Sequence, residues 1–469
     1  MYLKRQIFLV FGLSRSGKAA ANYLLAQGAS VYVHDEIESD RIAQTIAELE
    51  EKGAKRLSKE KLTAAPTFCD ALVLSPGIPI DHPLAVSFKR SGKGVISECE
   101  LAVRCMRLPM IAVTGTNGKT TTVSMLTDVL KAGGLSAVAC GNIGMPILEA
   151  LENETGDIAV AEISSFQLET LSSHCPHIAV VLNLTEDHLN RHYSMENYIF
   201  LKQKLLKNLT ETEFAVLNYD DLTVRAFAEK TKAKVLYFSL KEKVCGGYLE
   251  KGDLYFGKEK IMSVDEVSIG GMHNLQNALA AMVAAKIMGV SSADIASALS
   301  SFKGVNHRIQ TVEEVSGITF INDSKGTNVD ATLKAVFAMK MDTVLLLGGK
   351  DKGYHYDALF AELKKSCVTH AVLYGENRFT LLQCARAASF DNISLCAGFE
   401  MAVRLAIMQA KSGQAVLLSP ASASFDAFAN YEERGDKFVE IVRQFAQEER
   451  NRESAQKASS VLEENEQDE

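Results

Sequence analysis

The amino-acid sequence predicts an α/β protein of about three domains, each built around a mostly parallel sheet. Two observations predict this class. Apolar segments of strand length alternate with longer segments in which apolar residues recur at helical spacing. Several apolar segments also run directly into loops of glycine and polar residues, as the strands of open parallel sheets do. The length of 469 residues then sets the number of domains.

Composition restricts the kind of protein further. Hydrophobic residues make up 47% and charged residues 23% of the chain, as in ordinary globular proteins. The net charge of −8 and the lack of a basic stripe argue against a nucleic-acid partner. The nine cysteines form no C-x-x-C pair and indicate free thiols in a reducing compartment. Because neither a signal peptide nor a membrane-length apolar segment is visible, we expect a cytoplasmic protein with no membrane partner.

Residues 1–107 predict a Rossmann-like first domain. An apolar strand at 7–11 is followed by the turn Gly12–Gly17, an Ala-rich helix, and a second strand that ends at Asp35. Ser14 replaces the middle glycine of the G-x-G-x-x-G fingerprint, where a pyrophosphate must approach closely, so a nicotinamide oxidoreductase is disfavoured. Another nucleotide-like ligand stays open, with Asp35 accepting hydrogen bonds from its ribose or base.

A second candidate loop of the first domain follows the strand 71–74. The segment Ser75-Pro-Gly-Ile-Pro79 is a rigid turn at the carboxyl end of that strand, where ligands gather in open parallel sheets. Pro109 then indicates a linker, which places the domain boundary near residue 107.

A central domain, residues 108–308, opens with the most specific motif. An apolar strand, the turn Gly115–Gly118 and a helix follow one another, as in a phosphate-binding loop. Lys119 would contact the β- and γ-phosphates, and the Thr120 hydroxyl would ligate Mg²⁺. Val113 stands where the common pattern has glycine, so this is the shorter G-x-x-G-K-T form. We therefore predict a P-loop ATPase-like domain; a structural turn with an incidental lysine is the disfavoured alternative.

Two further strands of this domain end near side chains that can ligate a metal. The strand 157–162 ends in Glu162, a second ligand or water-positioning group for Mg²⁺, with a solvated glutamate as the alternative. The next strand leads to His188, which suits a Mg²⁺ or substrate contact better than a plain surface position. His188 and His192 are spaced as in a zinc helix, but Leu189 replaces the general-base glutamate, so a zinc protease is disfavoured.

The rest of the central domain carries weaker signals. A helix over 196–209 has lysines that we interpret as a solvated face: Lys202, Lys204 and Lys207. Residues 235–270 predict short strands and turns, and residues 270–277 are expected to cap a long helix, 278–288.

The alternation of strand-like and helix-like segments over residues 309–446 predicts a second Rossmann-like domain at the C-terminal end. Strands are expected at 318–321, 343–347, 371–374 and 415–418. Polar side chains at or beyond these strand ends could converge on one cleft: Asp323, Lys325, Lys352, Ser424 and Arg434. Residues 447–469 are rich in Glu, Gln, Asn and Ser and predict a disordered acidic tail.

Short motifs follow one another along the chain, within a match that runs in order from about residue 7 to 440. They are Gly115-Thr-Asn-Gly-Lys-Thr-Thr121, Gly141-Asn-Ile-Gly144, Glu162-Ile-Ser-Ser-Phe-Gln-Leu-Glu169, Asn183-Leu-Thr-Glu-Asp-His-Leu189, His273-Asn-Leu-Gln-Asn277, Asn306-His-Arg308, Asn322-Asp-Ser-Lys-Gly-Thr-Asn328 and Ser419-Pro-Ala-Ser-Ala-Ser-Phe-Asp-Ala-Phe428. In this combination the chain resembles the Mur ligases of peptidoglycan synthesis. The Ser-Ser-Phe-Gln-Leu-Glu run and the compact first domain are most similar to the members that use D-glutamate.

The resemblance implies an ATP-dependent ligase that forms an amide bond. Its substrates would be UDP-N-acetylmuramoyl-L-alanine, D-glutamate and ATP, and the reaction would pass through an acyl phosphate. Another Mur-type or folylpolyglutamate-type ligase is the alternative within the superfamily. A catalytically silent ATP-binding interaction protein is the alternative outside it. We expect a monomer.

The resemblance also implies roles for individual residues. The ATP phosphates would be held by Gly115, Thr116, Asn117, Gly118, Lys119, Thr120 and Thr121, and Asn277, Arg308 and Asp323 would face the nucleotide. The Mg²⁺ ligands would be Thr120, Glu162, His188 and Lys202, with two ions expected and Lys202 carbamylated. Lys119, Glu162, His188 and Lys202 would be the catalytic group.

Substrate contacts follow from the same resemblance. The UDP-muramoyl substrate would meet Asn142, Ser75 and Gly77, with Arg15, Ser16 and Asp35 around its uridine end. The incoming amino acid would be bound by Lys325, Thr327, Lys352, Ser424, Phe425 and Tyr431. The loop Gly348-Gly-Lys-Asp-Lys352 fits the family's G-G-x-x-K pattern and favours Lys352 over Lys350.

Overall fold

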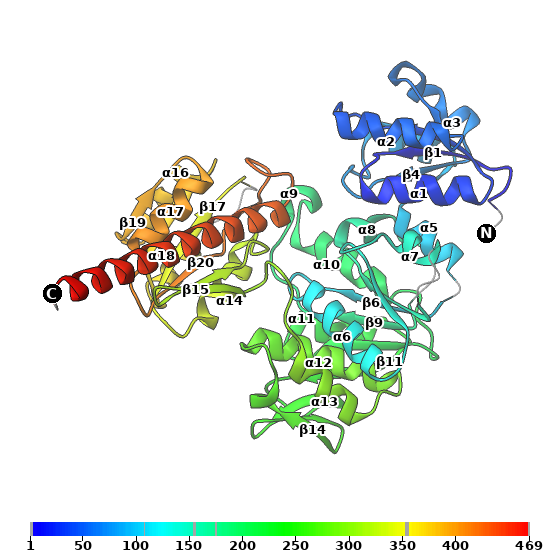
Figure 1. Cartoon of the computed structure of the whole chain (residues 1–469). Helices are drawn as coiled ribbons and strands as arrows, with labels where there is room; N and C mark the ends of the chain where they lie inside the picture. The colour runs from blue at the N-terminus through cyan, green and yellow to red at the C-terminus, as the bar shows by residue number, and fades with distance from the viewer. Residues whose placement is uncertain (1–2, 107, 153–155, 174–175, 352–355, 468–469) are drawn as a thin grey trace. The chain divides into compact units, whose positions relative to one another are not determined.

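The computed structural model describes residues 3–106, 108–152, 156–173, 176–351 and 356–467. The chain divides into two compact units, Met1–Lys303 and Gly304–Glu469. The first unit holds a five-stranded and a nine-stranded sheet, and the second unit holds a six-stranded sheet. Helices accompany all three sheets (Figure 1). The predicted α/β class with mostly parallel sheets is confirmed.

The first sheet has the strand order β3-β2-β1-β4-β5, and all its pairs are parallel. Its strands are β1 (Ile7–Phe11), β2 (Ser30–His34), β3 (Lys55–Arg56), β4 (Ala71–Leu74) and β5 (Gly94–Ile96). Its main helices are α1 (Arg15–Ala26), α2 (Asp40–Glu51), α4 (Pro83–Arg90) and α5 (Glu98–Cys105). β1 is apolar throughout and almost fully buried, as expected for a central strand covered on both faces. Gly17 lets α1 start close to β1, because a Cβ there would lie 1.8 Å from the carbonyl oxygen of Gly12.

The nine-stranded sheet has the order β14-β13-β12-β11-β10-β9-β6-β8-β7. Its parallel part comprises β6 (Met110–Thr114), β7 (Ala137–Gly141), β8 (Ile158–Glu162), β9 (Ile178–Val181), β10 (Phe214–Asn218) and β11 (Lys234–Ser239). β12 (Gly246–Glu250) pairs parallel with β11, and β13 (Asp253–Phe256) and β14 (Glu259–Ser263) continue antiparallel. Strand β6 thus lies between β8 and β9, and the loops after these three strands share one edge of the sheet.

Helices of the first unit bring further loops to that edge. Helix α6 (Lys119–Ala132) follows β6 and packs against α12 (Met272–Ile287) and α13 (Ser292–Ser301). Short helices follow the neighbouring strands: α7 (Ile147–Glu152), α8 (Ser165–Thr170), α9 (Leu189–His192), α10 (Met195–Gln203) and α11 (Leu222–Arg225). Helix α12 begins earlier than predicted, so residues 272–277 are its first turns rather than a cap. The prediction placed the start where the Ala-rich segment begins, at residue 278, whereas Gly271 is the residue before the helix.

The second unit has the strand order β15-β16-β20-β17-β18-β19, with only β15–β16 antiparallel. Its strands are β15 (Gln310–Val315), β16 (Ile318–Asn322), β17 (Thr343–Gly348), β18 (Val368–Tyr374), β19 (Ile393–Leu395) and β20 (Ala415–Leu418). Its helices are α14 (Val329–Ala338), α15 (Asp357–Leu363), α16 (Arg378–Ala387), α17 (Phe399–Gln409) and α18 (Tyr431–Gln467). Apolar clusters line both faces of this sheet.

The C-terminal segment differs from its prediction. Residues 447–467 were expected to form a disordered tail, but they continue helix α18. The prediction of disorder from composition considers only whether the segment has enough apolar residues to bury. Ala, Glu, Gln, Lys and Arg also have high helix propensity. The nucleation cost is met by the first turns of α18, where Phe438, Ile441 and Val442 are buried in the core.

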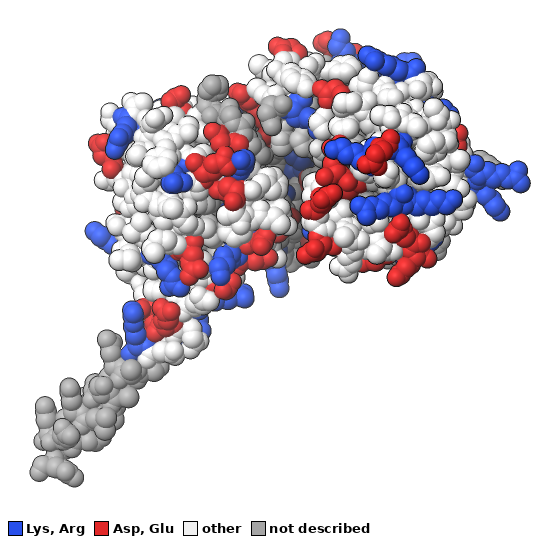
Figure 2. Space-filling view, turned by 90° about the horizontal axis from the view of Figure 1, so that it is seen from above, with Lys and Arg blue, Asp and Glu red and all other residues white. Residues whose placement is uncertain are grey.

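The surface carries both signs of charge. On the face shown in Figure 2, acidic and basic side chains are interspersed, in keeping with 50 basic and 58 acidic residues in the sequence. Among the described residues, no helix is both long enough and apolar enough to cross a bilayer.

Glu98 is a buried carboxyl group that joins α5 to α7. It is 2% exposed, and its Oε1 accepts a hydrogen bond from the Leu148 backbone N–H at 2.7 Å. Burial raises the pKa of Glu98 to about 7, although the backbone N–H groups of Leu148 and Ile147 oppose this rise. Because the native pKa exceeds that of the unfolded chain, the native state binds more protons between those values, and stability falls as the pH rises.

We predict that Glu98→Gln removes this loss. Relative to the wild type, the variant should gain on the order of 3 kcal/mol of unfolding free energy between about pH 5 and pH 8. Urea unfolding of both proteins at several pH values checks this. Glu149→Gln, which changes an exposed carboxyl on α7, is the control and should show no such trend. A difference between Glu98→Gln and wild type that does not vary with pH would contradict the prediction.

Candidate active site

The phosphate-loop motif forms a tight turn between β6 and α6. Gly118 precedes the helix with φ +87, and a Cβ at this position would lie 2.2 Å from Asn277 Oδ1. Lys119 Nζ donates hydrogen bonds to the carbonyl oxygens of Gly115 at 3.0 Å and Thr116 at 2.7 Å. Its ammonium therefore lies over the turn, as a lysine that receives phosphate oxygens must.

Asn183, directly after β9, holds this turn from the neighbouring strand. Its Oδ1 accepts from the Asn117 backbone N–H at 2.9 Å, and its Nδ2 donates to the Asn117 carbonyl at 3.0 Å. Thr116 Oγ1 donates to the Thr185 carbonyl in the same loop at 3.0 Å. The sequence analysis included Asn183 in a motif without giving it a role. Its position at the end of a strand was the signal that could have identified it.

Glu162 lies at the centre of a short chain of polar contacts. Its Oε2 accepts from Thr120 Oγ1 at 2.7 Å, and its Oε1 accepts from Asn142 Nδ2 at 2.9 Å. The side chain is 1% exposed, so the solvated-glutamate alternative is wrong. A hydroxyl and a carboxylate at this spacing are suitable oxygen ligands for Mg²⁺, which also uses waters and phosphate oxygens. Over the described ranges, no group of three or more His, Cys, Asp or Glu side chains could hold a metal by itself.

Lys202 is buried rather than solvated, which corrects the interpretation of its helix as a plain surface face. It is 1% exposed, and its Nζ donates to Thr114 Oγ1 and to the Gly115 carbonyl, both at 3.0 Å. Burial lowers the pKa of Lys202 well below the usual lysine range, and the nearby Lys119 charge lowers it further. Composition could not reveal this, because both acceptors lie in the distant β6 segment.

The two histidines of this region have different surroundings. His188 precedes α9 in a left-handed conformation (φ 54), and its ring packs on Phe166 with centroids 4.8 Å apart. Its side chain is 29% exposed, which leaves a path to a ligand. His192 is 3% exposed, and its Nε2 lies 2.9 Å from Ser165 Oγ. Burial lowers the pKa of His192 to about 4, so its ring is uncharged at neutral pH.

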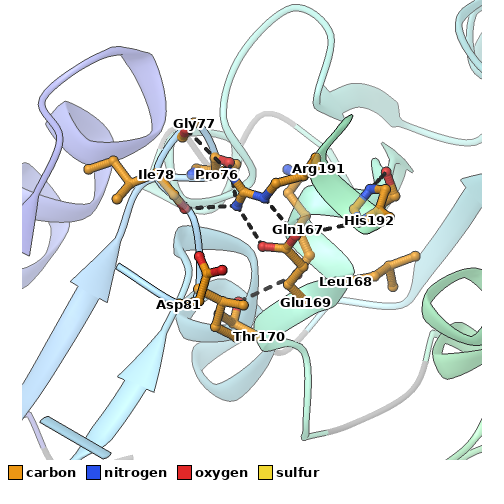
Figure 3. A network of polar contacts seen from close by, with 12 residues as sticks. Pro76, Gly77, Ile78, Asp81, Gln167, Leu168, Glu169, Thr170, Arg191 and His192 are labelled. Carbon is orange, nitrogen blue, oxygen red and sulfur yellow. Dashed lines mark hydrogen bonds and ion pairs between the residues drawn. The ribbon is translucent and has the colours of Figure 1, made fainter. Parts of the chain in front are cut away.

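An arginine that the sequence analysis gave no role lies beside them. Arg191 on α9 forms an ion pair with Glu169 at the end of α8, with 2.7 Å between Nη2 and Oε2. The guanidinium also faces the loop after β4, at residues 76–78 (Figure 3). No local sequence pattern marks this contact.

The first sheet brings its candidate residues to the carboxyl ends of β1, β2 and β4. Asp35 Oδ2 accepts from the Leu13 backbone N–H at 2.6 Å, and Oδ1 accepts from the Ile37 N–H at 2.8 Å. The Ser75 N–H donates to the Phe11 carbonyl at 2.9 Å, which ties the loop after β4 to β1. Arg15 and Ser16 occupy the first turn of α1, beside the same sheet edge.

In the second unit, Asp323, Lys325 and Thr327 lie on the loop after β16, and Ser424 and Phe425 lie after β20. Arg308 precedes β15, and Tyr431 begins α18. Asp323 is 6% exposed and accepts from Ser419 Oγ at 2.7 Å. Burial raises the pKa of Asp323 to about 7, and the hydrogen bond from Ser419 and the Arg308 charge oppose the rise. Lys325 Nζ lies 3.7 Å from the Tyr431 ring centroid.

Three other predicted residues of this unit have contrasting positions. Ser424 is 2% exposed, whereas Phe425 is 66% exposed. The Thr327 backbone N–H donates to the Lys325 carbonyl at 2.8 Å within the loop. Lys352 lies outside the described residues.

Arg434, at the start of α18, contacts both the loop after β16 and the loop after β20. It is fully buried, and its guanidinium donates to Ser324 Oγ at 3.0 Å and to the Ser324 carbonyl at 2.7 Å. It also donates to the carbonyls of Ser422 at 3.1 Å and Ala423 at 3.2 Å. Arg434 was expected at a cleft, but its side chain is fully buried and its hydrogen bonds join the loop at Ser324 to the loop at Ser422 and Ala423.

Comparisons with known proteins agree with this arrangement. Residues 6–97 match the Mur ligase MurD-like N-terminal domain, residues 113–285 the Mur ligase middle domain, and residues 307–422 the Mur ligase glutamate ligase domain. The UDP-N-acetylmuramoylalanine–D-glutamate ligase of Clostridioides difficile is 39% identical over 448 residues, covering 94% of this chain and 99% of that protein. The chain belongs to the Mur ligase family.

Further relatives of the same name extend this result. The ligase of Thermoanaerobacter pseudethanolicus is 41% identical over 454 residues, covering 94% of this chain and 99% of its own. The ligase of Streptococcus mutans is 40% identical over 433 residues, covering 92% and 95%.

Solved structures show that the fold is shared. The UDP-N-acetylmuramate-alanine ligase MurC of Thermotoga maritima has a TM-score of 0.60 at 18% identity, covering 94% of this Mur ligase and 99% of that chain. The MurF ligase of Thermotoga maritima in complex with ADP has a TM-score of 0.57 at 17% identity, covering 96% of both chains.

The tight turn before α6 leads to a prediction about nucleotide binding when Gly118 is replaced by alanine. Gly118→Ala should weaken binding of ATP with Mg²⁺ by roughly tenfold or more, since alanine is strained at this φ and its methyl group would displace Asn277. Gly134→Ala is the matched control, because Gly134 has φ +79 but nothing within 4 Å of an added Cβ. Calorimetric titration of both variants checks this. Equal affinity in the two variants would contradict the role of the turn.

Proposed function

We propose that this Mur ligase joins D-glutamate to UDP-N-acetylmuramoyl-L-alanine through an acyl phosphate, with release of ADP and phosphate from ATP, in peptidoglycan precursor synthesis. The observation that carries the proposal is the identity of about 40% over nearly the whole chain with ligases named for this reaction. The inventory of the candidate site supports the same chemistry.

The reaction has two steps. An oxygen of the L-alanine carboxylate attacks the γ-phosphorus of ATP, and ADP leaves, which gives an acyl phosphate. The amine nitrogen of D-glutamate then attacks the acyl carbon, phosphate leaves, and the nitrogen loses a proton. A carboxylate alone is a poor acyl donor, so the first step supplies the leaving group that amide formation requires. Positioning and charge stabilisation supply most of the catalysis in such transfers.

The first unit would bind ATP and the sugar nucleotide. The turn Gly115–Thr121 would hold the phosphates, with Lys119 opposite the charge that develops on the transferred group. Mg²⁺, which supplies charge neutralisation when bound, would be held by Thr120 and Glu162, whose hydroxyl and carboxylate oxygens lie 2.7 Å apart. His188 would be a further metal-site residue.

We also propose that Lys202 is carbamylated and takes part in holding a second Mg²⁺. An uncharged amine is required to attack carbon dioxide at its carbon atom. The burial of Lys202 and its lowered pKa favour that form. The carbamate would place an anionic oxygen ligand beside Thr114 and the phosphate loop.

The remaining substrate contacts are proposals of the same kind. The muramoyl part would meet Asn142, Ser75 and Gly77, and the uridine end Arg15, Ser16 and Asp35. Asn277, Arg308 and Asp323 would face the nucleotide. The amino acid would be bound by Lys325, Thr327, Lys352, Ser424, Phe425 and Tyr431. The domain boundaries near residues 107 and 308, the monomeric state, the cytoplasmic location and the lack of a nucleic-acid partner stay predictions.

A ligation assay tests the function directly. Purified protein is incubated with ATP, Mg²⁺ and UDP-N-acetylmuramoyl-L-alanine, and phosphate release and the product mass are followed with D- or L-glutamate. We expect release that requires the sugar nucleotide and D-glutamate together. Release with a folate precursor or a different muramoyl precursor would favour the alternative ligase activity, and the absence of any release would favour a binding protein.

Lys119→Ala should lower the rate of this reaction by about two orders of magnitude or more, as expected when a preorganised charge contact to the transition state is removed. Lys131→Ala is the matched control, since Lys131 lies in the last turn of the same helix. Steady-state phosphate release at saturating substrates measures both variants. Near-normal turnover of Lys119→Ala would contradict the assignment.

A further inference from the structure

Arg191 joins two segments of the first unit that carry candidate substrate residues (Figure 3). Its Nε donates to Glu169 Oε1 at 2.9 Å and its Nη2 to Oε2 at 2.7 Å, which is a bidentate pair. The Arg191 and Glu169 side chains are 14% and 8% exposed. In such poorly solvated surroundings, charge-assisted hydrogen bonds are stronger than at the surface.

The same guanidinium also faces three successive carbonyl groups of the loop after β4. Nη2 donates to the Ile78 carbonyl at 2.8 Å, with longer contacts of 3.5 Å to Pro76 from Nη2 and to Gly77 from Nη1. One side chain thus contacts the main chain of an entire turn. Only a planar group with several fixed donors can do so while it also pairs with a carboxylate.

These contacts fix the direction of the turn. The C=O and N–H of a trans peptide point in opposite directions, so the Pro76 carbonyl that faces Arg191 turns the Gly77 N–H away from it. The Ile78 N–H is used within the turn, where it donates to the Ser75 carbonyl at 2.9 Å. The Gly77 N–H is therefore directed to the side of the loop opposite Arg191.

At its other end, Arg191 belongs to the segment that carries His188. Both residues contact the Phe166 ring, with 5.2 Å from the guanidinium carbon and 4.8 Å from the His188 ring centroid. His192 adds a contact to Glu169, at 3.6 Å between Nδ1 and Oε1. Arg191 is therefore held on the α9 side by Phe166 and Glu169, and from there it contacts the loop after β4.

We propose that Arg191 is a positioning residue that anchors the Ser75–Ile78 turn to α9, in the conformation that binds the UDP-muramoyl substrate. The inference rests on the proposed function. It assigns to Arg191 an effect on the affinity for the sugar nucleotide, exerted through the Gly77 backbone, and no effect on the affinity for ATP.

Arg191→Lys tests this proposal, because a lysine keeps the charge but cannot form the fork. We expect the dissociation constant of UDP-N-acetylmuramoyl-L-alanine, measured by calorimetry without ATP, to rise about tenfold through the loss of charge-assisted hydrogen bonds. The KM of the same substrate should rise similarly, while the dissociation constant of ATP with Mg²⁺ stays within about twofold of the wild-type value. Thermal unfolding verifies that the variant is folded.

Two controls separate positioning from general damage. Tyr193→Phe removes an exposed contact between the same two segments, the 2.9 Å hydrogen bond from Tyr193 Oη to Asp81. Arg104→Lys disturbs another arginine–glutamate pair of the first unit, with 2.7 Å between Arg104 Nη2 and Glu100 Oε1. Both variants should bind the sugar nucleotide as the wild type does.

The outcomes distinguish this inference from the proposed function. If the wild type binds no UDP-N-acetylmuramoyl-L-alanine, the proposed function fails, and the inference fails with it. If the wild type binds but Arg191→Lys binds equally well, or loses affinity for ATP to the same extent, only the inference is overturned. Should Arg191→Lys not fold, Arg191→Met with Glu169→Gln replaces it, since this pair leaves no unpaired buried charge, and the same two affinities decide.

Discussion

Close backbone packing at the carboxyl end of β6 is the constraint on which the first unit depends. A Cβ at Gly115 would lie 3.0 Å from the Leu182 Cβ, and one at Gly118 would lie 2.2 Å from Asn277 Oδ1. A Cβ at Gly141 would lie 2.4 Å from the Glu162 carbonyl oxygen. The phosphate loop is therefore enclosed by β9 on one side, β8 on the other and α12 above the helix start. Lys119 and Thr120 are consecutive in the first turn of α6, and Thr120 contacts Glu162 at 2.7 Å, so the three side chains lie within reach of one ligand.

Burial also explains why ionisable groups in each of the two units have unusual pKa values. Burial opposes the charged form of any group, and it lowers the pKa of Lys202 while it raises that of Asp323 in the second unit. Such groups reduce stability unless they are hydrogen-bonded, and both have partners: Thr114 for Lys202 and Ser419 for Asp323. Ionisable groups with shifted pKa values cluster at functional sites, and the resemblance to the family gives both Lys202 and Asp323 a role at such a site.

Features that depend on the local residue pattern could be predicted from the sequence. The strand and turn that lead to Lys119, and the strand that ends in Glu162, could be read because their residues are consecutive. The contacts of Lys202, Arg191 and Arg434 could not, because their partners are 87, 113 and 110 residues away in the chain. A lysine on a basic helix has the same local pattern whether the tertiary fold buries or exposes it. The predicted start of α12 and the predicted disorder of residues 447–467 were wrong for a related reason. Asparagine and polar residues occur both inside helices and outside them.

The anchoring of the two loops by Arg434 has a consequence for biosynthesis. A ribosome releases the chain from the N-terminus, so the residues of the first unit and the sheet strands β15 to β20 emerge before the first turn of α18. Until that turn emerges, the carbonyls of Ser324, Ser422 and Ala423 lack the guanidinium that they contact in the native fold. The loops proposed to bind the amino acid therefore lack these contacts until the start of α18 has left the ribosome.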